Sequence, residues 1–346
     1  MGKEKKKQHY VPRCYMEQWS IPGKYQVYVY NKRQKKVYLS SINDIASERY
    51  FYDIDFSGIL SEDDLREMGL PERDPKHIDD EQYIENFFSK EIEGDLKRRI
   101  ERIINKGSKM SPWEIRNCYF LTETDKFYMS FHLAYQFIRV KSIRTSISDS
   151  NDCLRQVLED MGAPQEAIDR CIVPKTHLPL LHGEMILDKK EIDDLSRSFF
   201  SLTWILLVNK TDKPFFTSDN PIGTIAHIHH PILSMAGLDS RGVEVFYPLS
   251  PQIMLLMLDG EYHREYQGSD RRVDVVDNEE VIKYYNSRCV IRSDNCIFSV
   301  TDDFSVIDEM LAKNPNVLDE PHIVVNWGGK TYTPQKDGRK KHGAPV

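Results

Sequence analysis

The sequence predicts an α+β fold, in which a mixed, mostly antiparallel sheet is covered by a helical layer or insertion. Stretches with strand character lie in residues 1–57 and 201–310, whereas residues 79–200 have the apolar spacing of helices. No flexible linker interrupts the middle of the chain. We therefore expect a single domain over residues 1–346, with a basic tail at residues 335–346.

Composition restricts the class of protein. Of the 346 residues 40% are hydrophobic and 29% are charged, and the net charge of −7 argues against a protein that coats nucleic acid by charge alone. A local basic patch of Lys3, Lys5, Lys6 and Lys7 could still attract a polyanion. No run approaches the roughly 18 apolar residues that a membrane helix needs. The six cysteines are scattered, and no secretory leader precedes them, so we expect a cytoplasmic protein with reduced thiols.

The N-terminal third begins with an aromatic segment and a hairpin. His9 lies among aromatic residues, so we expect residues 8–19 to pack onto the body of the protein and not to form a free tail. Residues 25–30 and 36–39 alternate in polarity around a polar turn, which predicts a β-hairpin. Residues 50–52 are expected to add an edge strand.

A long helix is predicted over residues 79–104, where apolar residues repeat at helical spacing. Glu85 projects into the middle of that apolar stripe. A carboxylate directed at a core must be paired, protonated or solvated by a cavity, because unpaired burial is very costly. Glu85 is thus either a residue of a functional site or one half of a structural ion pair.

Another helix start is predicted at Ser111, where a capping serine is followed by Pro112 and by Glu114. The helix or helix pair that follows carries a polar strip that includes Gln136 and Arg139. Arg139 can hold a carboxylate or a phosphate with two parallel hydrogen bonds. It can equally be the partner of Glu85.

The centre of the chain is an apolar strand at residues 202–208. It is preceded by a helix at residues 150–175, which is interrupted by a Gly-Ala-Pro break, and by a helix at residues 188–200. After a break at Pro214, the polar residues Ser218, Asp219 and Asn220 emerge together before Pro221. Polar side chains on a loop held by a sheet are typical of functional sites. The alternative is an Asx-turn in which these residues bond their own backbone.

The last part of the chain is predicted to alternate strands with one helix. Residues 243–249 and 253–258 are expected as strands, residues 278–288 as a helix that includes Asn286, and residues 289–291 and 297–300 as further strands. His227 and His229 stand at the i and i+2 spacing of a metal-binding pair. Because no third ligand follows at a familiar spacing, we predict no metal ligands there.

Several motifs together resemble one known family, the domain of unknown function 4238 family of mainly bacterial proteins. The resemblance rests on QHYVP at residues 8–12, the helix with Glu85, the Gln-x-x-Arg at residues 136–139, FTSDNP at residues 216–221 and Asn286. It spans residue 8 to about residue 300. It implies that one site gathers His9, Glu85, Arg139, Asp219 and Asn220, and that the protein is similar to accessory proteins of bacterial genomes, some of them in phage defence.

Two classes of function fit such a site. The first is a hydrolase acting on nucleic acid or nucleotide phosphates, with a phage-defence or toxin effector as its expected setting, in which His9, Glu85 and Asp219 are catalytic. Its substrate would be bound by Gln8, Gln136, Arg139, Ser218, Asn220 and Asn286, and a divalent metal ion is left open as a cofactor. The second is a non-catalytic sensor that binds an anionic ligand or a phage component through the same residues. A purely structural role for the Glu85–Arg139 pair remains a third interpretation.

Overall fold

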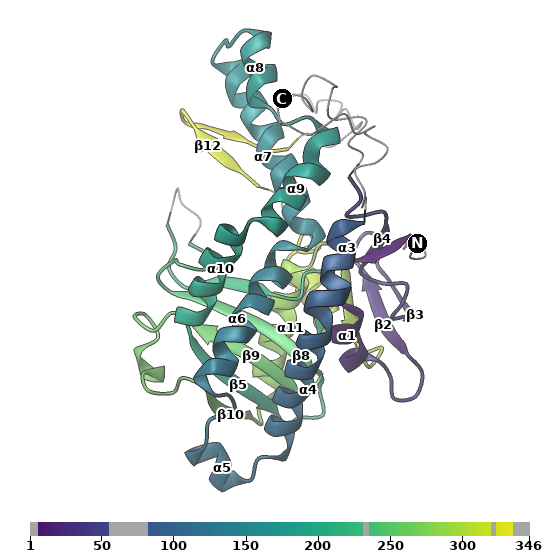
Figure 1. The fold of residues 1–346 in the computed structure, drawn as a ribbon, viewed down its shortest axis with the longest axis vertical. Helices are drawn as coiled ribbons and strands as arrows, with labels where there is room; N and C mark the ends of the chain where they lie inside the picture. The colour runs from purple at the N-terminus through teal and green to yellow at the C-terminus, as the bar shows by residue number, and fades with distance from the viewer. Residues whose placement is uncertain (1–5, 55–81, 231–234, 320–322, 335–346) are drawn as a thin grey trace.

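A five-stranded sheet forms the centre of the computed structural model, which describes residues 6–54, 82–230, 235–319 and 323–334 (Figure 1). Its strand order is β10-β5-β9-β8-β7. The strands are β5 (Thr203–Asn209), β7 (Gly223–Ala226), β8 (Val243–Ser250), β9 (Ile253–Leu258) and β10 (Arg272–Val276). Only the β10–β5 pair is parallel in this sheet. The α+β prediction is confirmed, and the predicted strands at residues 202–208, 243–249 and 253–258 are present.

A second sheet of four strands has the order β3-β2-β11-β6. The predicted hairpin forms it together with β6 and β11; its strands are β2 (Gln26–Asn31), β3 (Lys36–Ser41), β6 (Thr217–Ser218) and β11 (Cys296–Ser299). The hairpin thus shares a sheet with later strands, as expected, but the strands of residues 201–310 are divided between this sheet and the five-stranded one. The hairpin pairs with β11, and residues 217–218 pair with the other side of β11. Two short pairs complete the strands, namely β1 (Lys7–His9) with β4 (Ser47–Arg49) and β12 (Val325–Trp327) with β13 (Lys330–Tyr332).

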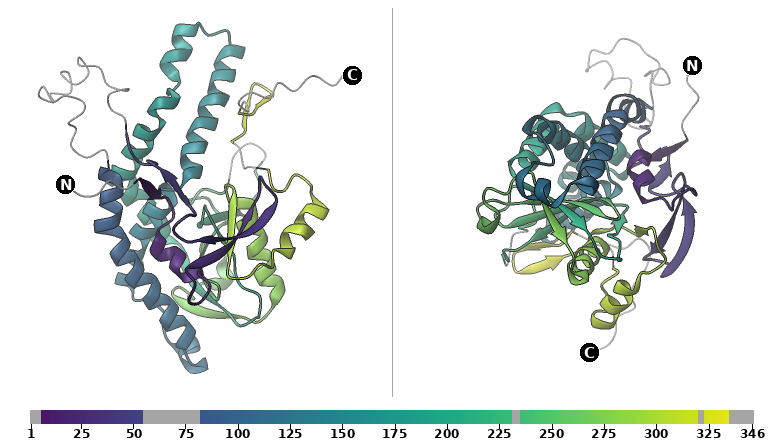
Figure 2. Two further views of the ribbon diagram at one scale, coloured as in Figure 1. Left: turned by 90° about the vertical axis from the view of Figure 1, so that its right-hand side faces the viewer. Right: turned by 90° about the horizontal axis from the view of Figure 1, so that it is seen from below.

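Helices cover both faces of the five-stranded sheet. On one face lie α4 (Glu93–Lys109), α6 (Glu123–Ile138) and α10 (Lys189–Ser201), and on the other lies α11 (Glu279–Arg292), against which α12 (Ser305–Lys313) packs (Figures 1 and 2). The hairpin of α7 (Lys141–Asp160), α8 (Gln165–Cys171), η5 (Lys175–His177) and α9 (Leu178–Leu187) projects beyond the sheets (Figure 2, left). The Gly-Ala-Pro break predicted within residues 150–175 is present: it separates α7 from α8, and Gly162 has a φ of +72°.

Helix starts follow the capping residues that the sequence carries. The capping box predicted at Ser111 is present, since Ser111 and Glu114 bond each other's backbone N–H at the start of α5 (Pro112–Asn117). Asp188 caps α10 in the same region where a helix was predicted. The described part of the helix expected from residue 79 begins as α3 (Tyr83–Phe87) and continues through a π-helical turn, η4 (Phe88–Ile92), into α4.

Two predicted strands are wrong. Residues 289–291 continue helix α11, because Cys289 and Val290 point into the core from the last turns of that helix. Residues 50–52 form a turn, in which Phe51 and Tyr52 are buried against other aromatic rings and make no strand pairing.

One main hydrophobic core joins the two sheets and the covering helices. Trp19 comes from the short segment α1 (Arg13–Met16) and η1 (Glu17–Trp19), so the N-terminal segment packs onto the body as predicted. None of the described helices combines the length and apolar character needed to cross a bilayer. The basic tail, the lysines at positions 3 and 5, and the polar stretch of residues 55–77 lie outside the described residues.

Candidate functional site

The N-terminal motif is held by its glutamine. Gln8 is fully buried; its Oε1 accepts from the backbone N–H of Tyr52 at 2.6 Å, and its Nε2 donates to Asp53. The adjacent strand pair matches Gln8 to Glu48 and His9 to Ser47. Gln8 therefore anchors the motif to the turn after β4 and has no surface with which to contact a substrate.

Arg139 connects this motif to the end of helix α6. Its Nη2 donates to the His9 carbonyl at 2.6 Å and to Glu93 Oε1 at 3.2 Å, and its Nε donates to the Tyr52 hydroxyl at 3.3 Å. The guanidinium also lies 3.9 Å from the centroid of the Phe88 ring, a cation–π geometry. Burial alone would lower the pKa of Arg139, but Tyr52 and Glu93 raise it overall. With 1% of its surface exposed, Arg139 positions its neighbours and does not reach solvent.

The carboxylate that pairs with Arg139 is Glu93, whereas the sequence suggested Glu85. Eight residues of a continuous α-helix correspond to about 800°, which would leave Glu93 about 80° away from Glu85 around the axis. The π-helical turn between them contains more residues per turn and brings Glu93 to the side that faces Arg139. Glu85 acts on the same guanidinium electrostatically, as a weaker contribution. Both carboxylates thus lie beside Arg139.

His9 is the most unusual titratable group of this cluster. Its Nε2 is covered and has no hydrogen-bond partner among the described residues, while the ring also bonds the backbone of Asn43. Burial lowers the pKa of His9 to about 4, and Glu93 opposes this shift. The charged groups around it are Glu93, Arg13 and Arg139. His9 is consequently neutral at pH 7 and retains an unused ring nitrogen.

The loop at residues 218–220 contains a local turn made by Ser218, whereas the Asx-turn that was the alternative interpretation is wrong, because Asp219 and Asn220 bond the backbone of distant residues. Ser218 Oγ donates to the Asn220 carbonyl at 2.8 Å and accepts from the Asn220 N–H at 3.2 Å. The Asn220 side chain donates to the Arg292 carbonyl at 3.1 Å. These two substrate-binding candidates therefore fix the loop against the end of α11.

Asp219 is enclosed by backbone. Its Oδ1 accepts from the Asp294 N–H at 2.9 Å, and its Oδ2 accepts from Asn295 at 2.8 Å and Cys296 at 2.7 Å. Burial, followed by the nearby Asp294 carboxylate, raises the pKa of Asp219 to about 7, although the three N–H donors lower it. The side chain is only 3% exposed. Asp219 is therefore not accessible for catalysis at the surface of the loop.

The two halves of the predicted site meet through Tyr10. No hydrogen bond or ion pair joins His9 to Asp219 in the described parts of the chain. The next residue, Tyr10, does interact with Asp219: burial raises the pKa of Tyr10, and the Asp219 carboxylate raises it further. Gln136 donates to the Tyr10 carbonyl at 3.3 Å from the α6 side. On the other side Asn286 accepts from the Phe216 N–H at 2.7 Å and donates to the Pro214 carbonyl at 2.9 Å. The predicted residues thus gather around residues 8–10 and 214–220 as two adjoining clusters.

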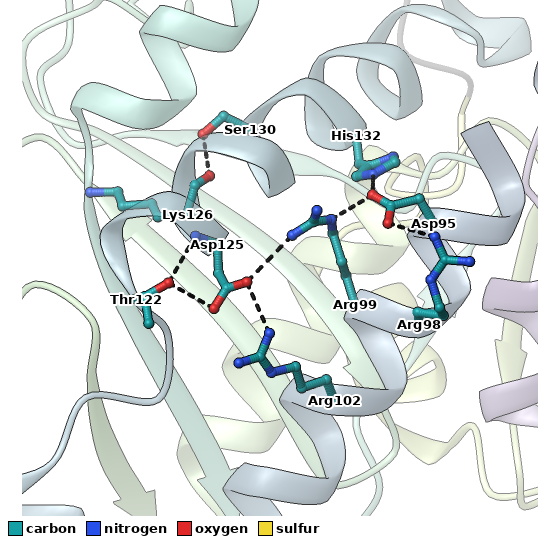
Figure 3. Close-up of polar contacts among 9 residues, drawn as sticks. All are labelled: Asp95, Arg98, Arg99, Arg102, Thr122, Asp125, Lys126, Ser130 and His132. Carbon is teal, nitrogen blue, oxygen red and sulfur yellow. Dashed lines mark hydrogen bonds and ion pairs between the residues drawn. The ribbon is translucent and has the colours of Figure 1, made fainter. Parts of the chain in front are cut away.

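A further polar network joins helices α4 and α6 (Figure 3). Asp95 accepts from Arg99 at 2.6 Å and contacts His132 Nε2 at 2.8 Å, while Asp125 contacts both Arg99, at 3.5 Å, and Arg102, at 3.0 Å. Partial burial would raise the pKa of Asp95, but hydrogen bonds from His132 and the arginines lower it overall. All the acids of this network are paired, so we assign it to the packing of the two helices.

Two residues of the first cluster were missed by the sequence analysis, Glu93 and Tyr52. Glu93 lies off the predicted apolar stripe, and nothing in the sequence marks a π-helical turn. Tyr52 was noted as part of an edge strand, and its hydroxyl instead accepts from Arg139 and donates to the Arg139 carbonyl at 3.2 Å. Only the aromatic run at residues 50–52 signalled its burial.

Comparison with known proteins gives one match. The model of a family described as protein of unknown function (DUF4238) matches residues 7–303, which is most of the chain. No curated protein and no solved structure matches.

Proposed function

The chain belongs to the DUF4238 family of proteins of unknown function, and from this premise we propose that it is a hydrolase acting on nucleic acid or nucleotide phosphates. His9 is the residue that transfers the proton. The observation that supports this role is the buried Nε2 of His9, which has no hydrogen-bond partner within the described residues and lies in a cluster of charged groups. A buried polar atom without a partner is uncommon and is expected where a ligand or a water completes the site.

Surrounding charges give the other roles. Glu93 is the carboxylate with the largest electrostatic effect on His9. It stabilises the imidazolium that forms when His9 takes up a proton. Arg139 holds both Glu93 and the His9 carbonyl, so it is a positioning residue. The exposed Lys6 and Arg13 flank His9 in the chain and supply positive charge for a phosphate. Asp219 leaves the catalytic set because its oxygens are committed to backbone N–H groups.

The reaction supported by these groups is attack of water on phosphorus. The neutral His9 imidazole accepts a proton from the attacking water as the new P–O bond forms, and the protonated ring returns it to the leaving oxygen as the old P–O bond breaks. A base with a pKa near 4 stays neutral well below pH 7. Activity should therefore persist at pH 5 to 6 and decline only as the pH approaches about 4.

The experiment compares phosphate-ester hydrolysis by the wild-type chain, His9→Gln and Glu93→Gln. Single-stranded and duplex DNA, RNA and nucleoside triphosphates serve as substrates, each with Mg²⁺, with Mn²⁺ and with a chelator, because the metal requirement is part of the proposal. Loss of general acid–base catalysis lowers a rate by about 10²- to 10⁴-fold. We expect that loss in His9→Gln at an unchanged melting temperature. His177→Gln, which alters a partly exposed histidine of η5, is the matched control.

Failure to hydrolyse any of these substrates, or full activity in His9→Gln, would refute the proposal. If the substrate proves to be nucleic acid, a role as a phage-defence or toxin effector becomes testable by comparing the growth of cells that express the wild-type chain or His9→Gln.

A second candidate is a binding protein that senses an anionic ligand. It is favoured by the commitment of Gln8, Ser218, Asp219 and Asn286 to internal hydrogen bonds, which leaves few groups for chemistry. The same variants separate the two candidates. In a sensor, Arg13→Gln weakens nucleotide binding and no variant changes a rate, whereas in a hydrolase His9→Gln lowers the rate and leaves nucleotide affinity intact.

A further inference from the structure

Three metal-ligand side chains meet at one end of the five-stranded sheet, away from the motifs discussed above. They are His227, Glu244 and His263, and one donor atom from each lies within 4.8 Å of the other two. The strand order explains the meeting. Antiparallel pairing places Glu244 of β8 opposite Ile225 of β7 and Leu258 of β9. The segment that follows β7 and the segment that follows β9 therefore both pass beside the first residues of β8.

Backbone hydrogen bonds hold the two segments in place. Asp259 accepts from the Gly242 N–H at 2.8 Å and from the Tyr262 N–H at 3.2 Å, and its carbonyl accepts from the His263 N–H at 3.0 Å. The His227 N–H donates to the Gly242 carbonyl at 3.0 Å. Gly242 has φ +77°, a conformation in which an L side chain would be strained. The donors are thus presented by short, well-bonded turns.

Two of the three side chains are buried, and each has one potential metal-ligand atom that lacks a hydrogen-bond partner among the described residues. Glu244 is 6% exposed and His263 is 7% exposed. Neither Glu244 Oε1 nor His263 Nε2 has a hydrogen-bond partner of normal geometry among the described residues. The Tyr285 hydroxyl lies near the Glu244 carboxylate and interacts with it without completing such a bond. Burying a carboxylate and an imidazole with unmet hydrogen-bonding capacity is costly, unless a ligand normally satisfies them.

The third side chain is accessible. His227 is exposed, and its Nε2 lies 2.7 Å from Glu244 Oε2, so in the present state it pairs with the carboxylate. On the far side, His263 Nδ1 lies 3.6 Å from the exposed Glu265 carboxylate. This separation is too long for a hydrogen bond, so the carboxylate does not fix the tautomer of the ring. The other ring nitrogen has no hydrogen-bond partner within the described residues and is the one available to a metal ion. His263 Nε2 is that other nitrogen.

From this geometry we infer that His227, Glu244 and His263 form a binding site for a divalent transition metal ion of the zinc class. Two imidazole nitrogens and one carboxylate oxygen suit Zn²⁺ and its first-row neighbours better than Mg²⁺ or Ca²⁺, which prefer oxygen ligands. Bonds of about 2.0 to 2.2 Å around a tetrahedral ion bring donors to about 3.4 Å from one another. The exposed His227 is the side chain that can move to achieve this, as the ion replaces its hydrogen bond to Glu244.

Three protein ligands leave the fourth tetrahedral position open, which is the arrangement of zinc ions that act on a substrate or a water molecule. The sequence suggested His229 as the companion of His227. Strand β7 ends at Ala226, so the two histidines lie beyond the strand and the i, i+2 argument loses its basis. The site shares no residue with the His9 cluster, so it stands or falls independently of the proposed hydrolase activity.

The test uses the full-length chain without a histidine tag, treated with chelator and titrated with Zn²⁺ by calorimetry. We expect one equivalent to bind the wild-type chain and affinity to fall at least tenfold in Glu244→Gln and in His263→Gln. His229→Gln and His177→Gln are matched controls that should bind normally. Zinc should raise the melting temperature of the wild-type chain and leave that of Glu244→Gln unchanged.

Absence of stoichiometric binding by the wild-type chain would overturn the inference, as would equal affinity in Glu244→Gln and His263→Gln. Loss of binding in His229→Gln with retention in Glu244→Gln would also overturn it, because the ion would then sit on the exposed histidines. A measurement on the wild-type chain guards against variants that fail to fold. Zinc should protect His227 from carbethoxylation by diethyl pyrocarbonate while His177 stays reactive; equal modification of His227 with and without zinc would refute the site.

Discussion

Asp219 and Glu244 are two buried carboxylates with opposite surroundings. Asp219 lies in the loop after β6, where three backbone N–H groups satisfy both of its oxygens. Glu244 lies on β8, where one oxygen pairs with His227 and the other has no normal hydrogen bond among the described residues. Exposure is 3% for Asp219 and 6% for Glu244, so burial alone does not separate them.

This difference separates a structural acid from a candidate ligand. A carboxylate whose acceptor capacity is filled by the protein contributes to the architecture, and removing it leaves buried donors unpaired. A carboxylate with an unfilled oxygen beside an unfilled imidazole costs stability in the absence of a ligand. The same criterion, whether hydrogen bonds within the protein satisfy the group, assigns Arg139 to the architecture, because it bonds Tyr52, Glu93 and a backbone carbonyl. It assigns His9 to a candidate functional site, because one ring nitrogen has no partner among the described residues.

Arg139→Met should have the largest effect, a loss of about 3 to 5 kcal/mol in the free energy of unfolding. The change removes a buried charge and leaves Glu93 and the His9 carbonyl without their donor. Denaturant titration measures it. Arg197→Met, at an exposed position of α10, is the control and should change stability little. A loss below about 1 kcal/mol in Arg139→Met would show that the satisfied cluster is not structural.

Asp219→Asn should cost about 2 to 4 kcal/mol, because the amide group turns a donor toward backbone N–H groups that need an acceptor. Asp212→Asn, at an exposed position before the same loop, should be neutral. Thermal and denaturant unfolding of both variants give the comparison. Stability equal to wild type in Asp219→Asn would contradict the assignment of Asp219 to the architecture.

The pH dependence of stability should have opposite signs for Asp219 and His9. The pKa of Asp219 is raised from 3.8 to about 7, so the folded state keeps a proton that the unfolded state releases, and this contribution to stability falls as the pH rises from about 4 to about 7. The pKa of His9 is lowered from 6.5 to about 4, so stability is lost as the pH falls through that window. Each slope is at most about 1.4 kcal/mol per pH unit.

Denaturant titrations between pH 4 and 7.5 would measure these slopes. Asp219→Asn should remove the first contribution and His9→Gln the second, so the two variants deviate from wild type in opposite directions. Parallel curves for all three proteins would contradict both assignments.

Glu244→Gln should have the smallest effect on the metal-free protein, a change within about 1 kcal/mol or a modest gain. Glutamine preserves the shape and an acceptor for His227 while removing a buried charge. Unfolding in the presence of chelator measures this. A loss as large as that of Asp219→Asn would place Glu244 among the structural acids and remove the contrast between the two regions.

Local structure was largely predictable from the sequence. The capping box at Ser111, the cap at Asp188 and the apolar runs that form β5, β8 and β9 depend on neighbours a few residues away, and these elements are present. The wrong strand at residues 289–291 has a physical reason. A short apolar run is buried equally well as a strand or as the last turn of a helix, so its pattern does not distinguish the two.

The candidate sites were predictable only in part. His9, Arg139 and Glu85 do lie in one cluster, as the family resemblance implied, but the sequence did not indicate that Glu93 forms an ion pair with Arg139. The π-helical turn that causes this leaves no mark in the composition of residues 88–92. Asp219 looked equally reactive in the sequence, and its three backbone donors come from residues more than 70 positions away.

The sequence by itself determined the fold class and the position of most helices and strands, because these follow from periodicity and from contacts between near neighbours, and its motifs indicated the family. Only the tertiary structure decided which polar residues have their hydrogen bonds satisfied. That decision depends on donors from distant segments, as when β7, β8 and β9 bring His227, Glu244 and His263 together. Whether a buried acid is structural or available to a ligand is therefore a property of the folded chain.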